Sequence, residues 1–476
     1  MKKEQMPLVQ ALFQYIEEGI VRHHMPGHKG GQGFCQEILT NLAQMDVTEI
    51  PGMDDLHNAK GAIDRAQRLA AKAFGSHHSW FLVNGSTSGI HAMILAACPP
   101  GSSLIVPRNC HKSVINAMIM GDVSPIYILP QYDMERGLAT QITPAAVKQA
   151  LESNPDARGV LLVSPNYYGM CADVEEIAHI VHKKDKVLLV DEAHGAHFPF
   201  NLKLPSSAGE LGADLWVHSA HKTLPSFTQT AYLHLKGQRI NKDRVSQILS
   251  IGQTSSPSYI FMASLDWARY FMCTQGQDLL SRLIDKLMGV RELLKIDPGI
   301  NSPIRSIWPE VPALDPTRLV IDFKELGLTG YQAEKILRQE EGIQMEMSDH
   351  RYGIFICTVA DTQSQLEKIV QACQSLGKNH RKEGNDPFTL SVSREIPKQM
   401  MSPRQAFYSK RGKIPLIESQ GRISASTIGA YPPGIPRYCP GEQIAKEGIE
   451  ELLLIQRGGG NLFGVQEDSY VDVVIE

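Results

Sequence analysis

The chain has 476 residues, of which 42% are hydrophobic and 21% are charged, and its formal net charge is −4. This length allows two or three domains around a sizeable core, and an acidic balance without a basic stripe argues against a nucleic-acid partner. The eight cysteines include no Cys-x-x-Cys pair, which argues against a zinc site and a disulfide framework. Because no run approaches the roughly 18 apolar residues that span a bilayer, we expect a cytoplasmic protein with no membrane partner.

The first 30 residues are expected to form an N-terminal arm, residues 1-30. A short amphipathic helix is predicted there, with Leu8, Leu12, Tyr15 and Ile16 on one side, followed by the loop HMPGHKGG. His23, His24 and His28 could suggest a metal site, but the Pro-Gly pair prevents the helix that two ligands four residues apart would need. We therefore expect no metal, and we interpret His28 as a loop histidine near an active site.

A large domain is expected over residues 31-285, where helices and strands alternate. Helices are predicted at 62–73 and 173–183, and the second opens with Asp173 and Glu176 as a capping pair. The predicted strands lie at 80–83, 104–106, 126–129, 160–163, 187–190 and 215–218. Since these strands are short, apolar throughout and separated by helices, they indicate a mostly parallel sheet covered on both faces.

A smaller α/β domain is expected over residues 286-385, after a long helix at 278–295 that bridges to it. Its predicted strands are 319–323 and 353–359, and its predicted helices are 331–341 and 363–376. The polar segment 377–386 is typical of a linker. The remainder, residues 386-476, is richer in proline and glycine and is predicted to be a separate C-terminal α+β module.

An amine, a carboxylate and an imidazole are expected to meet at the carboxyl edge of the large sheet. Lys222 ends the stretch LWVHSAHK, and the strand 187–190 is followed by Asp191-Glu192-Ala193-His194. α/β folds bind ligands at this edge. A lysine that binds pyridoxal 5'-phosphate covalently, beside an aspartate that keeps the pyridine nitrogen protonated, is the arrangement such an enzyme needs. A lysine after a strand is by itself usually a solvated loop residue, so it is the combination that points to this cofactor.

The segment NGSTSG, residues 84–89, lies between a predicted strand and a predicted helix. Its glycines, its hydroxyl groups (Ser86 and Thr87 among them) and the free N–H groups of a helix start are typical of an anion site. Ser219 and His221 supply further donors that could converge on the same phosphate. The alternative is a tight turn with ordinary N-capping.

Two further segments follow predicted strands. His111 could stack its imidazole on a pyridine ring, although a hydrogen-bonded loop histidine is the common alternative. The segment SPNYYG, residues 164–169, could contact cofactor or substrate, or could be a turn without a ligand.

The sequence DEAH at 191–194 also resembles the magnesium-binding strand of a DEAH-box helicase. That function requires a phosphate loop of the form G-x-x-x-x-G-K-[ST]. Gly412-Lys413 is followed by Ile414 and Gly377-Lys378 by Asn379, so neither segment fits. The helicase interpretation is rejected.

Nine ordered motifs resemble those of the bacterial ornithine/lysine/arginine decarboxylases of the aspartate-aminotransferase fold. They are HMPGHKGG (24–31), DDLH (54–57), NGSTSG (84–89), PRNCHKS (107–113), SPNYYG (164–169), DEAHGAH (191–197), SAHKTLP (219–225), TSSPSY (254–259) and YPPGIPRYCPGE (431–442). The resemblance implies an α/β, fold-type I enzyme dependent on pyridoxal 5'-phosphate. It also implies the short form of the family, which lacks the N-terminal wing domain of the long forms.

The resemblance also implies residue roles. Lys222 would bind the cofactor covalently, Asp191 would pair with the pyridine nitrogen, and His111 would stack on the ring. The phosphate would be held by Ser86, Thr87, Ser219 and His221, and His194, where long forms commonly have Trp, would lie beside the cofactor. The family's active sites are shared between the subunits of a homodimer or higher homo-oligomer, so Thr254 or Ser255 would reach the neighbour's phosphate.

The predicted reaction is α-decarboxylation of a basic amino acid (arginine, lysine or ornithine) to CO2 and the corresponding amine of polyamine biosynthesis; arginine is favoured because well-known short forms of the family act on it. Spacing alone leaves open an aminotransferase, a racemase or a non-catalytic regulatory homologue. The positively charged side chain of a basic substrate needs carboxylates in the site to pair with it. The candidates are Glu442, alternatively a surface turn residue, and Asp54 with Asp55, alternatively helix caps.

Overall fold

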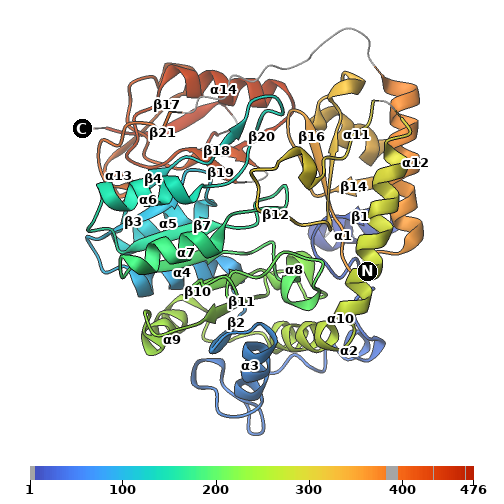
Figure 1. Ribbon diagram of the computed structural model, residues 1–476, viewed down its shortest axis with the longest axis horizontal. Helices are drawn as coiled ribbons and strands as arrows, with labels where there is room; N and C mark the ends of the chain where they lie inside the picture. Colours follow the sequence, from blue (N-terminus) through green and yellow to red (C-terminus); the bar gives the residue numbers. More distant parts are fainter. Residues whose placement is uncertain (1–5, 298, 382–394, 432–433, 467, 476) are drawn as a thin grey trace.

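The computed structural model describes residues 6–297, 299–381, 395–431, 434–466 and 468–475 (Figure 1). Its centre is a seven-stranded sheet in the order β2-β11-β10-β9-β7-β3-β4. The strands are β2 (His78–Leu82), β3 (Ser103–Pro107), β4 (Ser124–Ile128), β7 (Gly159–Val163), β9 (Val187–Asp191), β10 (Leu215–His218) and β11 (Ala231–Leu235). Only β11 runs antiparallel to its neighbours in this sheet, so the predicted mostly parallel sheet is confirmed.

All six strands predicted for the large domain are present, with bounds shifted by at most two residues. The strand β11 was missed, although all five of its residues are buried. The predicted helix 62–73 is α3 (Ala62–Ala73), and the predicted helix 173–183 is α7 (Val174–Lys183). Asp173 caps α7 by accepting a hydrogen bond from the Glu176 backbone N–H at 3.1 Å, as its sequence pattern predicted.

Helices cover both faces of the large sheet, which explains why its strands are apolar throughout. One face packs against α4 (Gly85–Ala97), α5 (Lys112–Gly121) and α9 (Lys242–Gly252). The other face packs against α3, α6 (Pro144–Ser153) and α7. Successive residues of one strand point to opposite faces, so Leu161 belongs to the first cluster and Leu162 to the second. Because helices cover both faces, polar side chains are placed at the carboxyl edge of this sheet.

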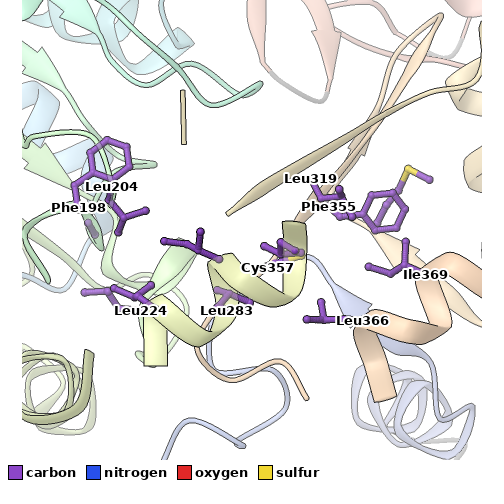
Figure 2. Packing of buried hydrophobic residues seen from close by; sticks show 14 of the residues in the cluster. Phe198, Leu204, Leu224, Leu283, Leu319, Phe355, Cys357, Leu366 and Ile369 are labelled. Carbon is purple, nitrogen blue, oxygen red and sulfur yellow. The ribbon is translucent and has the colours of Figure 1, made fainter. Parts of the chain in front are cut away.

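The bridging helix is longer than predicted. The structure has one helix, α10 (Tyr259–Leu294), so the predicted start near residue 278 is wrong, and the expected domain boundary at 285/286 falls inside the helix. The first half of α10 is helical because Met262, Leu265, Ala268 and Met272 recur at helical spacing and are buried. Its second half brings Leu283 between the two domains, with Phe198 and Leu224 on one side and the small domain on the other (Figure 2).

The small domain has an antiparallel sheet in the order β13-β16-β15, formed by β13 (Arg318–Asp322), β16 (Tyr352–Ile356) and β15 (Met347–Ser348). Its helices are α11 (Gly330–Gln339) and α12 (Gln363–His380). The N-terminal arm joins this domain, because β1 (Val21–His23) pairs in parallel with β14 (Ile343–Met345). Residues 377–380 of the predicted linker end α12, and residues 382–386 lie outside the described residues.

The predicted N-terminal amphipathic helix is α1 (Pro7–Glu17), and Leu8, Leu12 and Ile16 are exposed on it. The further short elements before the C-terminal module are α2 (Gln36–Thr40), β5 (Tyr132–Asp133), β6 (Leu138–Ala139), β8 (Met170–Cys171), α8 (Ala220–Thr223) and β12 (Ala313–Leu314). No helix in the described part of the chain combines the length and the apolar composition needed to span a bilayer.

The C-terminal residues pack on the large domain above its sheet (red in Figure 1). They form α13 (Pro403–Tyr408), β17 (Arg411–Pro415), β18 (Ile428–Tyr431), β19 (Ile435–Tyr438), α14 (Lys446–Arg457), β20 (Asn461–Phe463) and β21 (Tyr470–Val474). A buried ion pair between Arg108 and Glu442, with 2.9 Å between Nη2 and Oε2, joins the two parts. The module therefore contributes a wall to the space at the carboxyl edge of the sheet.

Candidate active site

A cavity of about 290 Å³ opens at the carboxyl edge of the large sheet. Side chains from all three parts of the chain line it. The large domain provides Ser86, Asn109, His111, Tyr167, Asp191, His194 and Lys222, the small domain Asp349 and His350, and the C-terminal module Ile435 and Glu451. Five of the predicted site residues, namely Ser86, His111, Asp191, His194 and Lys222, therefore meet in one cavity.

Asp191 and Lys222 lie side by side because β9 and β10 are parallel neighbours. Asp191 is the last residue of β9 and is in register with Val217, and Lys222 follows β10 in the short helix α8. Asp191 is buried, and its Oδ1 accepts a hydrogen bond from the Ala193 backbone N–H at 3.1 Å. Burial raises the pKa of Asp191 and lowers the pKa of Lys222, and each of the two opposite charges partly counteracts the shift of the other.

His194 is buried next to Lys222. Its Nε2 lies 2.9 Å from the Lys222 Nζ, and its Nδ1 lies 3.3 Å from Nη2 of Arg318, at the start of β13. The Tyr167 ring packs against the imidazole, with 4.4 Å between the ring centroids. Burial, followed by the charges of Lys222 and Arg318, holds the pKa of His194 well below its usual value, so the ring is neutral.

His111 caps the N-terminus of α5. Its Nδ1 accepts a hydrogen bond from the Ser113 backbone N–H at 3.3 Å and lies 2.8 Å from the Ser113 hydroxyl. Burial and then the charge of Lys222 lower its pKa to about 4, so a neutral, oriented imidazole faces the cavity.

The start of α4 provides the predicted anion site. Gly85 opens this helix with φ of +73°, and the Ser219 hydroxyl donates to the Ser86 hydroxyl at 2.7 Å. Ser86 lines the cavity, Ser219 is buried behind it, and Thr87 is exposed outside the cavity lining. The N–H groups of the first helical turn and these two serines could hold a phosphate.

His221, two residues after Ser219, was predicted as a further hydrogen-bond donor to the phosphate. Its Nδ1 donates to the Thr230 carbonyl oxygen at 3.0 Å, and burial lowers its pKa to about 4. The neutral ring therefore leaves Nε2 unprotonated, since only one nitrogen of a neutral imidazole carries the proton. His221 can donate to a phosphate only after the anion has raised its pKa.

Thr254 and Ser255 are exposed in the connection between α9 and α10 and lie outside the cavity lining of their own chain. The Thr254 backbone N–H donates to Oδ1 of Asn84, the residue that precedes α4, at 3.3 Å. The segment is thus on the surface and next to Asn84, the residue that precedes the candidate anion site.

The carboxylates proposed from the sequence for the substrate side chain have other partners. Glu442 is buried behind Arg108 and also accepts from the Cys439 backbone N–H at 2.7 Å. Asp54 accepts backbone hydrogen bonds around the start of α3, and Asp55 caps the turn at His57. Within the described part of the chain, the carboxylates that line the cavity besides Asp191 are Asp349 and Glu451.

Sequence reasoning missed Arg318, Asp349 and Glu451. Each lies more than 90 residues from Lys222 along the chain and carries no motif of its own. Tyr167, by contrast, lies in the segment SPNYYG, which the sequence indicated as a possible contact to cofactor or substrate because it follows a predicted strand.

These side chains fit pyridoxal 5'-phosphate. Lys222 offers an amine inside the cavity, Asp191 offers a buried carboxylate for a cationic ring nitrogen, and the start of α4 offers donors for a phosphate. The fold and the site together define a pyridoxal-phosphate-dependent enzyme of fold type I.

Comparisons with known proteins identify the family. The model of the Orn/Lys/Arg decarboxylase major domain matches residues 6–312, and that of the Orn/Lys/Arg decarboxylase C-terminal domain matches residues 388–468. The chain is 40% identical to an arginine decarboxylase of Bacillus subtilis over 459 residues, which cover 95% of this chain and 94% of the relative. It is 37% identical to an arginine decarboxylase of Halalkalibacterium halodurans, with 98% and 97% covered.

Among solved structures, the lysine decarboxylase of Francisella novicida superposes with a TM-score of 0.77 at 20% identity, covering 94% of this chain and 78% of that one. The chain belongs to the Orn/Lys/Arg decarboxylase family. It is a pyridoxal-phosphate-dependent enzyme that decarboxylates a basic amino acid.

Proposed function

We propose that this enzyme acts on arginine, with Lys222 as the lysine that binds the cofactor and Asp191 as the partner of its ring nitrogen. The observation that carries the two residue roles is the position of the Lys222 amine, in one cavity with the carboxylates of Asp191, Asp349 and Glu451. When bound, the cofactor supplies an electron-withdrawing ring that accepts the electron pair left by the departing CO2.

In this proposal, the residues of the chain orient the bound cofactor and stabilise its charges. A buried Asp191 carboxylate favours a protonated ring nitrogen because opposite charges interact strongly where water is excluded. His111 offers a neutral imidazole held in one orientation by Ser113, suited to packing against a flat ring. Ser86, at the start of α4, and Ser219, which precedes α8 and donates to the Ser86 hydroxyl, would fix the phosphate end, so the reacting atoms are presented to Lys222.

The substrate's cationic group is expected to pair with Glu451. Its side chain is 11% exposed, and its Oε2 accepts from Arg437 Nε at 2.8 Å. Asp349 is a weaker candidate because its Oδ1 accepts two backbone N–H groups, from Arg351 and Tyr352, at 2.7 Å each, and Oδ2 accepts from the Tyr168 hydroxyl. Glu451, which also lines the cavity, is therefore proposed as the carboxylate that pairs with the guanidinium, a group that binds carboxylates in a bidentate manner.

Arginine is proposed as the substrate because the two curated relatives described above act, by their names, on arginine. Incubation of the enzyme with arginine, lysine and ornithine, followed by mass spectrometry, tests this. Loss of CO2 from arginine with the highest kcat/KM is expected. Preference for lysine or ornithine would contradict the arginine proposal, and formation of a keto acid would indicate transamination.

Replacing Glu451 by Gln is expected to lower kcat/KM for arginine at least about tenfold, because a partly buried cation loses its charged partner. Inhibition by neutral norleucine should change little, since norleucine has no charge to pair. The matched control is Glu450→Gln, a neighbour on α14 whose carboxylate is 65% exposed and pairs with Lys446. If Glu451→Gln and Glu450→Gln behave alike, or if norleucine competes as well as lysine with the unmodified enzyme, this assignment is wrong.

We further propose that the working unit is at least a homodimer with shared active sites, located in the cytoplasm. The exposed Thr254-Ser255 segment beside the anion site supports the shared site. The eight cysteines, all free, support a reducing compartment.

Mixing two inactive variants is expected to restore activity. One variant carries Lys222→Ala, and the other carries Thr254→Ala with Ser255→Ala. After random exchange of subunits, about a quarter of the wild-type activity should return, because half of the dimers are hybrids and each hybrid has one intact site. A fully active monomer by light scattering, or no recovery although mass spectrometry shows hybrids, would contradict the shared site.

A further inference from the structure

Three nitrogen-bearing side chains lie in a row that leads from the cavity lining into the protein interior. The Lys222 Nζ is 2.9 Å from His194 Nε2, and His194 Nδ1 is 3.3 Å from Arg318 Nη2. His194 and Arg318 are 4% and 3% exposed, so both side chains are largely shielded from bulk water. The arrangement determines which atom in the row carries each proton.

A guanidinium only donates hydrogen bonds and stays charged at every physiological pH. His194 Nδ1 must therefore accept the hydrogen bond from Arg318, which leaves the proton of the neutral imidazole on Nε2. The Nε2–H group points at the Lys222 Nζ, so the lysine nitrogen must accept it with a lone pair. Only an uncharged amine has that lone pair.

The opposite arrangement brings two donors together. A charged Lys222 ammonium would donate to Nε2 and move the imidazole proton to Nδ1. That N–H group would then face an N–H group of Arg318 at 3.3 Å inside a buried site. Unpaired buried donors are costly, so the charged lysine is disfavoured by the guanidinium two side chains away.

We propose that Arg318 is a positioning residue that fixes the tautomer of His194 and thereby keeps the Lys222 amine uncharged in the cofactor-free protein. An uncharged amine is the form that reacts with a carbonyl group, so the lysine is prepared for its cofactor. The inference rests on the role proposed for Lys222.

The position of Arg318 is itself determined by the fold. It starts β13, and its Nε and Nη1 have no hydrogen-bond partner among the described residues. Gly169, with φ of +86°, makes room for it, because a Cβ at Gly169 would lie 3.0 Å from the Cβ of Arg318. Gly169, the last residue of the segment SPNYYG, thus leaves the space that Arg318 occupies.

The pKa of Lys222 is shifted in the direction that an uncharged amine requires. Burial and the charge of Arg318 lower the pKa of Lys222, while Asp191 and Glu346 raise it, and the net shift is downward. Around His194, burial lowers its pKa most, and the permanent charge of Arg318 lowers it further. Lys222 should therefore react with electrophiles at a lower pH than an ordinary lysine.

Competitive labelling of the cofactor-free protein with acetic anhydride measures the charge state. The extent of acetylation at Lys222 is followed by peptide mass spectrometry between pH 6 and pH 11, and the rate of pyridoxal phosphate uptake is followed at the same pH values. Arg318→Met should reduce labelling at pH 8 about tenfold, the change that one pKa unit produces. Arg318→Lys, which keeps a cation, should lose less.

Two further variants separate the tautomer effect from general damage to the sheet and from a direct effect of charge. Arg351→Met removes an arginine that pairs with Asp322 at the other end of β13, so it controls for general damage and should leave Lys222 labelling unchanged. In a His194→Phe background, Arg318→Met should have little further effect. An equal effect with and without His194 would mean that the charge acts directly on Lys222, and the tautomer proposal would be wrong.

An unchanged labelling profile in Arg318→Met would also overturn the inference. If instead borohydride reduction of the loaded enzyme labels a lysine other than Lys222, it is the proposed function that fails. The two failures are distinguishable because the acetylation experiment uses neither cofactor nor substrate.

Discussion

Replacing Lys222 by alanine is expected to reduce decarboxylation to the level of a reaction without enzyme. Its amine is the only lysine nitrogen that lines the cavity among the described residues, and an alanine cannot bind the cofactor covalently. The wild-type protein should be yellow, and reduction with borohydride followed by peptide mapping should place the label on Lys222. The measurement is CO2 release together with the absorbance spectrum.

A matched control is Lys236→Ala, which removes a lysine whose Nζ donates to the Gly209 carbonyl oxygen at 2.9 Å, away from the cavity. This variant should stay yellow and active. Activity of Lys222→Ala near the wild-type level, or a borohydride label on another lysine, would refute the central assignment.

Replacing Asp191 by asparagine is expected to leave part of the cofactor bound and to lower kcat about 100- to 1000-fold, the usual cost of removing one preorganised electrostatic contact. Asparagine has the same shape but no charge, so it does not favour a protonated ring nitrogen. Asp191→Glu, which keeps the charge, should retain more of the rate. Turnover of Asp191→Asn close to wild type would refute the electrostatic role.

The stability of Asp191→Asn separates this role from simple misfolding. Burial raises the pKa of Asp191 above its unfolded value, so the folded protein binds this proton more tightly. The stability associated with the group is therefore present at low pH and decreases as the pH rises from the unfolded pKa to the folded pKa. At neutral pH, asparagine should raise the melting temperature of the cofactor-free protein while activity falls. A lower melting temperature would indicate that the carboxylate stabilises the fold instead.

Local patterns in the sequence determined the core of the large domain. Six strands were predicted because each is a short apolar run that is bounded by polar or turn residues, and burial on both faces of a sheet requires such runs. The same rule placed Asp191 and Lys222 together, because parallel neighbours bring their carboxyl ends to one edge. The capping of α7 by Asp173 was likewise predictable from a few adjacent residues.

The extent of α10 was not predictable from its first half alone. The residues 259–277 include aromatic side chains and a glycine, which lower helix propensity. Packing of Met262, Leu265 and Ala268 in the core overrides that propensity.

Only the tertiary structure decided which distant side chains complete the site. Arg318 reaches His194 across 124 positions of sequence, and Glu451 arrives from the C-terminal module. Such contacts leave no periodic or local signal, because they depend on how three separately patterned regions pack around one cavity. The sequence by itself therefore determined the amine and the carboxylate at the sheet edge. The tertiary structure decided the charges that surround them, since the pKa of a buried group is set by burial and by neighbours in space.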